Sequence, residues 1–160
     1  MKINSDRTTS KKLCLSGIVI ALYVVIMFIS QSFAFGAIQV RIATSLYSLS
    51  YFFPFLVLPL GISNILSNLI LGSLGILDII GGGIVGILTS FFVFLIKKYQ
   101  LNYKLIVIPI IFIPGFIVPI WLSALIKAPY LPLAVSVCLG QVIPAMIGIF
   151  LIKKLNFRRS

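Results

Sequence analysis

The sequence predicts an all-α membrane protein, a bundle of six transmembrane helices, and three observations support this. Hydrophobic residues make up 61% of the 160 residues and charged residues only 9%, whereas a soluble globular domain carries about 25% charged residues. The apolar runs are continuous rather than alternating, which favours helices over a barrel. Because a bilayer needs about 20 apolar residues per helix, residues 1–160 accommodate six spans in a single membrane domain, with no separate soluble domain.

Prolines, glycines and charges divide the chain into these spans. A basic lead-in, 1–12, precedes the first span, and no small-x-small cleavage site follows, so we predict a signal anchor. After a semi-polar loop, 31–41, the next apolar segment is too long for one span, and Pro59 divides it. The six expected spans lie within 13–152 and cover approximately 13–30, 42–59, 59–74, 78–96, 105–126 and 133–152.

The basic residues orient the predicted bundle. The net charge is +11, from 13 Lys and Arg against two acidic residues. With six spans both ends lie on one side, together with the loop 97–104, and the lead-in (1–12), this loop and the tail (153–160) hold all positive residues except Arg41 and Lys127. The positive-inside rule makes that side cytoplasmic. We therefore attribute the excess charge to membrane topology and expect no nucleic-acid partner, although such a charge in a soluble protein would suggest one.

Three charged residues are predicted near the outer face: Arg41, Asp78 and Lys127. Charged groups close to hydrocarbon are costly unless they are paired or face a polar cavity, so each is a candidate functional residue. Lys127 is explained more simply as an anchor whose ammonium reaches the interface. Arg41 and Asp78 are explained equally well as a structural ion pair, with Asp78 as the N-cap of the fourth span.

Neutral polar side chains gather in the same part of the sequence. Asn64 and Asn68 are four residues apart and share a helix face. Hydrogen bonding between helices would explain either alone, whereas both together beside outer-side charges favour a ligand pocket. Trp121 and Tyr130 are expected nearby, as a stacking wall with Gln141 or as an aromatic belt. The candidate substrate-binding residues are Asp78, Arg41, Asn68, Asn64, Gln39, Thr44, Tyr47 and Trp121.

The residue inventory argues against an enzyme. There is no histidine and only one acidic residue, Asp78, close to the membrane, so Ser-His dyads, paired aspartates and His-ligated metal sites are not expected. No glycine-rich phosphate loop with a lysine is present, so we expect no ATP hydrolysis by this chain. Cys14 and Cys138 have neither disulfide nor metal spacing. The sequence therefore predicts a binding protein without a cofactor of its own.

Two segments carry a family resemblance. The first is IQVRI at 38–42, which leads into Leu46 and is followed by a Gly61–Asn68 segment, and the second is LGILDIIG at 74–81. In their order and spacing these segments resemble the QueT family, whose members are substrate-binding S components of energy-coupling factor (ECF) transporters for queuosine precursors. The resemblance covers nearly the whole chain in length and span order, and it is most specific between Gln39 and Gly83.

The resemblance implies a six-helix S-component bundle in a bacterial plasma membrane, with an outward-opening cavity beneath the loop after the first helix. Gly17 and Ala21 would match the small-residue motif that docks on the transmembrane coupling subunit. Two cytoplasmic ATPases would complete the complex and supply the energy from ATP.

The ligand implied is a 7-deazaguanine base, such as queuine, queuosine or the aminomethyl precursor. Its guanine-like edge offers two adjacent N–H donors. A carboxylate can accept both hydrogen bonds in a bidentate arrangement, and Asp78 would be that carboxylate. Asn68, Asn64 and Gln39 would satisfy the carbonyl and ring nitrogens, and an aromatic side chain would stack on the base. Arg41 would contact the ligand or hold Asp78 in place.

Thr44 is a departure from the family's R-I-x-E-x-L pattern, in which an acidic residue occupies this position. A second carboxylate would suit the cationic aminomethyl group, so its replacement by a hydroxyl favours a hydroxylated ligand such as queuine or queuosine. Two alternatives stay open: an S component for another vitamin-like solute, and a ligand-free membrane assembly or scaffold protein.

Overall fold

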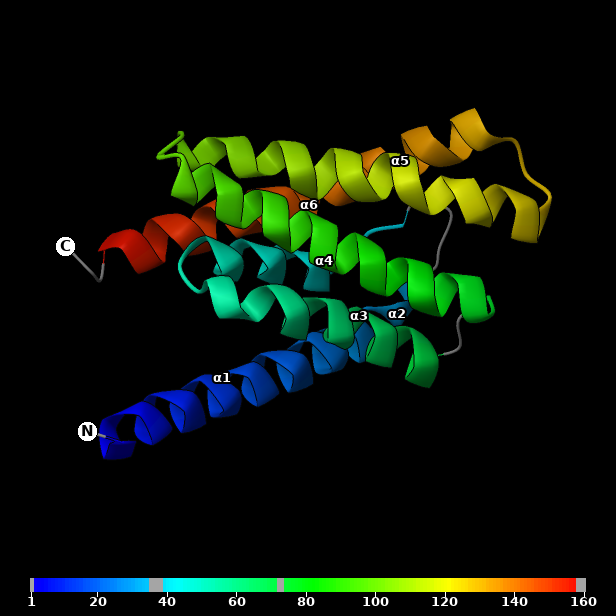
Figure 1. The fold of residues 1–160 in the computed structure, drawn as a ribbon. Coiled ribbons are helices and arrows are strands. Elements are labelled where there is room, and N and C mark those ends of the chain that lie inside the picture. Colours follow the sequence, from blue (N-terminus) through cyan, green and yellow to red (C-terminus); the bar gives the residue numbers. More distant parts are fainter. Residues whose placement is uncertain (1, 35–38, 72–73, 158–160) are drawn as a thin grey trace.

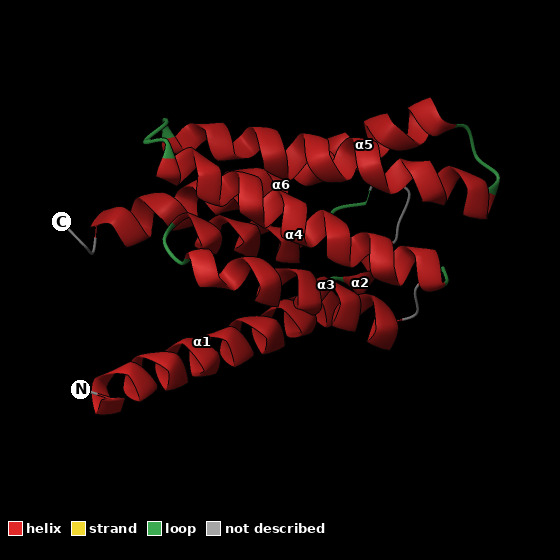
Figure 2. Ribbon diagram, viewed as in Figure 1, coloured by secondary structure: helices red, strands yellow, loops and turns green. Residues whose placement is uncertain are grey.

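The computed structural model describes residues 2–34, 39–71 and 74–157, and within these ranges the chain is helical without strands (Figures 1 and 2). Residues 35–38 of the predicted loop, and Arg158 and Arg159 of the basic tail, lie outside them. The elements are α1 (Lys2–Ile29), α2 (Gln31–Ala34), η1 (Ile42–Tyr51), η2 (Pro54–Leu56), α3 (Val57–Leu71), α4 (Ile76–Lys98), η3 (Tyr103–Ile106), α5 (Val107–Ile126) and α6 (Tyr130–Phe157).

The prediction of an all-α membrane protein is confirmed. Much of the outer surface is apolar, with large exposed side chains such as Ile29, Leu131 and Phe150. Such a surface suits lipid, whereas soluble monomers rarely expose large contiguous apolar patches. The described residues contain five segments long and apolar enough to cross a membrane, namely Thr9–Ile29, Pro54–Leu71, Ile76–Lys98, Tyr103–Ile126 and Tyr130–Asn156.

The exact count of six spans is not confirmed, because the predicted second span is a short 3-10 helix. At about 2.0 Å per residue, the 10 residues of η1 cover roughly 20 Å, less than the roughly 30 Å of the hydrocarbon core. The chain also turns at Phe52 and Phe53 rather than at Pro59. Pro54 begins the next helix, where its missing N–H leaves no hydrogen bond unmade.

Hydroxyl groups form hydrogen bonds along the tightly wound η1. The hydroxyls of Thr44, Ser48 and Ser50 each donate to the carbonyl three residues earlier, at 2.7 Å. Side chains that bond to nearby carbonyls compete with the regular helical ladder, and acceptors three residues back match the 3-10 repeat. Most of η1 is buried, and it packs mainly on α6 and α4.

The helices run alternately in opposite directions, and η1 also returns the chain toward the N-terminal end (Figure 1). Both ends of the chain therefore lie at the same end of the bundle, as the charge pattern predicted. The last turn of α4, η3 and the end of α6 lie there too. We call this the basic end; its described basic side chains are Lys11, Lys12, Lys97, Lys98, Lys104, Lys153 and Lys154.

Glycines bring α3 and α4 into backbone contact. A Cβ on Gly61 would lie 3.0 Å from the carbonyl oxygen of Gly83, and one on Gly86 would lie 3.1 Å from the Gly61 Cα. Small residues allow this close approach between membrane helices. As a result, polar side chains on α3 lie directly over α4 near the end opposite the basic end.

Candidate functional site

The candidate site is centred on Arg41, which lies just before η1 and is only 8% exposed. Its Nη2 donates to Asn68 Oδ1 and, at 3.2 Å, to Asn64 Oδ1. The two asparagines are one turn apart on α3, so both amide oxygens reach the same guanidinium nitrogen. A buried charge is tolerated only when polar groups surround it, and these two oxygens supply part of that environment.

The amide nitrogens of the two asparagines extend the network in opposite directions. Asn64 Nδ2 donates to the Tyr47 hydroxyl at 2.9 Å, which lies 3.1 Å from the hydroxyl of Tyr23 on α1. Asn68 Nδ2 donates to the backbone carbonyl of Asp78 at 2.8 Å. Arg41 and the Asp78 segment of α4 are thus joined through Asn68.

Asp78 is not the N-cap that the sequence suggested. Gly75 occupies the cap position, and Asp78 is the third residue of α4. An acidic side chain in the first turn of a helix is favoured by the helix dipole. Asp78 is 7% exposed, and its Oδ1 accepts a hydrogen bond from Trp121 Nε1 on α5 at 3.2 Å. The Trp121 ring lies against Gly81, where a Cβ would approach to 2.8 Å, so it forms a wall beside the carboxylate.

Thr44 links the Arg41 region to α6. Its hydroxyl lies 2.7 Å from both the Arg41 carbonyl and Gln141 Oε1. One hydroxyl proton cannot serve two acceptors, and Gln141 Nε2 is buried without a hydrogen-bond partner among the described residues. Exchanging the amide nitrogen and oxygen lets Gln141 donate to Thr44 and Thr44 donate to Arg41. With the exchange, Thr44 and Gln141 form a hydrogen bond in which the hydroxyl proton and the donated amide proton each have a single acceptor.

The other predicted residues occupy separate places. Gln39 is half-buried, and its backbone carbonyl lies against Gly140 of α6. Tyr130 is exposed, and its hydroxyl donates to the Phe116 carbonyl rather than to the network. Lys127 is exposed in a left-handed conformation at the end of α5, as suits an interface anchor.

Gly17 and Ala21 lie on the exposed surface of α1 and take no part in the polar network. Both are exposed on α1, and a Cβ on Gly17 would meet nothing within 4 Å. This side of α1 offers the room that a second helix would need for close packing.

Gly82 supplies the space in which the asparagines lie. A Cβ at this position would be 2.6 Å from Asn68 Nδ2 and 3.1 Å from Asn64 Oδ1. We therefore expect Gly82→Ala to displace both amides and to weaken substrate binding about tenfold or more, comparable with the loss of one good hydrogen bond. Calorimetric titration of the purified variant measures this, with Gly17→Ala as the control that adds the same methyl group in open space. Equal weakening by both substitutions would contradict this role for Gly82.

Tyr23 was missed from the sequence, although it is completely buried and its hydroxyl bonds to that of Tyr47. A tyrosine midway along an apolar helix is the signal that could have found it, because a buried phenol needs a hydrogen-bond partner. Including Tyr23, the polar groups joined around Arg41 come from α1, η1, α3, α4, α5 and α6. Such a convergence of polar groups in an apolar bundle suits recognition of a polar solute.

The chain was compared with known proteins. Residues 13–157 match the model of a family described as "QueT transporter". Searches of curated proteins and of solved structures gave no match. The family match covers most of the chain and confirms the resemblance carried by 38–42 and 74–81. The chain is therefore a multi-pass membrane protein that belongs to the QueT transporter family.

Proposed function

We propose that the chain is the S component of an ECF-type importer and captures a 7-deazaguanine from outside the cell, as queuine, queuosine or the aminomethyl precursor. Membership of a transporter family supports a role in transport. The observation that carries the binding step is the buried cluster of Arg41, Asn64, Asn68 and Asp78, which lies away from the basic end. The positive-inside rule assigns the basic end to the cytoplasm, which gives the cluster an outward position.

Asp78 is the group proposed to recognise the base. An ionised carboxylate has about four lone-pair sites, and the Trp121 indole occupies one of them. The remaining sites suit the adjacent N–H donors of a guanine-like edge, since charge-assisted pairs of this kind are the stronger hydrogen bonds. The Trp121 ring beside the carboxylate offers an aromatic surface for the base.

The asparagines take a different role from the one expected. Their oxygens accept from Arg41, and their nitrogens donate to Tyr47 and to the Asp78 backbone. Asn64 and Asn68 are therefore proposed as positioning residues that hold Arg41 and the Asp78 segment in place for the ligand.

Thr44 and Gln141 form a neutral pair where the family pattern has an acid. Neither side chain supplies a second carboxylate for a cationic aminomethyl group, so we propose queuine or queuosine as the preferred ligand. Titrating the purified chain with queuine, queuosine and the aminomethyl base tests this. A clear preference for the aminomethyl base would overturn the choice of ligand. If none of the three compounds bound, the chain would be better explained as an S component for another vitamin-like solute. If, in addition, no small molecule co-purified with it, a scaffold role would be favoured.

Gly17 and Ala21 are proposed to contact the transmembrane coupling subunit, which would assemble with two ATPases. Because both residues are small and exposed, the double substitution Gly17→Leu, Ala21→Leu is expected to abolish co-purification of the coupling subunit and the ATPases. Substrate binding by the isolated chain should stay unchanged. Ala124→Leu adds comparable bulk at an exposed position on α5 and serves as the control. Normal assembly of the double variant would show that the partner docks elsewhere.

A further inference from the structure

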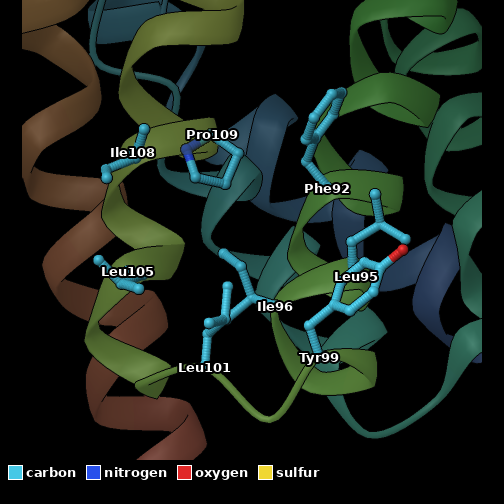
Figure 3. Close-up of a pocket in the computed structure, with 8 residues that line it drawn as sticks. All are labelled: Phe92, Leu95, Ile96, Tyr99, Leu101, Leu105, Ile108 and Pro109. Atoms are coloured by element: carbon cyan, nitrogen blue, oxygen red, sulfur yellow. The ribbon is translucent and has the colours of Figure 1, made fainter.

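A hollow at the basic end lies far from the candidate site. It is a groove of about 270 Å³ between the end of α4 and the start of α5. Figure 3 shows side chains of both helices lining it, with the connecting loop at one end. Its wall consists of apolar atoms, from residues that include Phe92, Leu95, Tyr99, Leu101, Leu105 and Ile108.

The loop that closes the groove is held in a defined shape. Gln100 has φ +54°, the left-handed conformation that commonly ends a helix. The Leu101 amide donates to the Ile96 carbonyl at 2.9 Å, and the Gln100 amide donates to the Lys97 carbonyl at 3.0 Å. This is the Schellman pattern, in which the residue after the turn packs back on the last helical turn. Leu101 and Ile96 both line the groove as a result.

Two exposed lysines are close in sequence to residues that line the groove. Lys98 and Lys104 are exposed, and each is the chain neighbour of a lining residue, Tyr99 and Leu105 respectively. The chain has only two acidic residues, and one of them, Asp78, belongs to the site at the other end of α4. The other, Asp6, lies in the lead-in, so positive residues greatly outnumber acidic ones at the basic end, which favours an anionic partner.

We propose that the groove binds an acyl chain of an anionic phospholipid whose phosphate is held by Lys98 and Lys104. An apolar groove favours a hydrocarbon chain, and exposed lysines at the same end of the bundle favour a negative headgroup. Basic sites between membrane helices on the cytoplasmic side bind such headgroups. Tyr99, which is 66% exposed and follows the last residue of α4, is of a type enriched where membrane helices meet the headgroup region. This inference is independent of the substrate.

The test compares phosphatidylglycerol with phosphatidylcholine of the same acyl chains, each titrated into the purified chain and detected by native mass spectrometry. We expect the chain to retain phosphatidylglycerol preferentially. The double substitution Lys98→Gln, Lys104→Gln should weaken that retention about tenfold to thirtyfold, from about 1 kcal/mol per lysine. Lys153→Gln, Lys154→Gln is the matched control, because these exposed lysines lie at the same end on α6.

A second variant tests the groove itself. Ile108→Trp fills it, whereas Ile120→Trp adds the same ring at a 62% exposed position elsewhere on α5. Loss of retention in Ile108→Trp alone supports the proposal. The proposal would be overturned if the two double lysine variants lost phosphatidylglycerol retention equally. Normal retention by Ile108→Trp would overturn it as well. Unchanged lipid retention combined with loss of a co-purifying membrane protein would assign the groove to a protein partner instead.

Discussion

Replacing Asp78 with asparagine is expected to weaken binding of the 7-deazaguanine about 100-fold or more while the fold stays intact. Hydrogen bonds to a charged group contribute about 1.5–3 kcal/mol each. The substitution removes one of the two proposed bonds to the base and leaves the other with a neutral, weaker acceptor. It also turns an amide N–H toward the N–H donors of the base. The Trp121 indole keeps its acceptor, because the introduced side chain retains an oxygen in the Oδ1 position.

Isothermal titration of the purified variant measures this loss, and its thermal unfolding checks that the fold is kept. Trp121→Phe is the matched control, since it removes the indole donor but leaves the carboxylate in place. We expect this control to weaken binding much less than Asp78→Asn. Full substrate binding by Asp78→Asn would exclude the carboxylate as the group that recognises the base.

Arg41→Gln is expected to destabilise the chain by about 2–5 kcal/mol and to abolish substrate binding. The shorter amide cannot reach both asparagine oxygens, and each buried polar group left unsatisfied costs about 1–3 kcal/mol. Arg41→Lys should also be destabilised, because a single ammonium does not reproduce the geometry of a guanidinium.

The free energy of unfolding in detergent, followed by Trp121 fluorescence, measures this effect. Lys127→Gln is the control, since it removes an exposed cation and should change stability by less than about 0.5 kcal/mol. If the free energy of unfolding of Arg41→Gln equalled that of the unsubstituted chain, the contacts of Arg41 with Asn64 and Asn68 would contribute no net stabilisation.

The sequence was most informative where polar residues interrupt apolar runs. Arg41, Asp78, Asn64 and Asn68 were singled out because such groups are costly in a membrane, and the structure joins them in one network. The shared end of the two termini followed from charge placement alone. Both conclusions rest on the cost of placing charge in hydrocarbon, which composition reveals without any knowledge of tertiary contacts.

Other features depend on contacts between distant residues. An apolar run such as 42–59 looks alike for an α-helix and a 3-10 helix, and the packing of η1 against α6 and α4 joins residues far apart in the sequence. The pairing of Thr44 with Gln141 joins residues 97 positions apart. The missing side chain of Gly82 makes room for two amides of α3, which the sequence of α4 alone does not show.

The short helix η1 has a mechanical consequence. Because it does not reach across the bilayer, its depth is set by neighbouring helices instead of by lipid. Tyr47 bonds to Tyr23 and Asn64, and Thr44 bonds to Gln141. Sliding η1 along its axis would break these bonds together and carry Arg41 with it. Capture and release of a solute would then be a single cooperative step, in which the contacts of the site with the ligand form or break together.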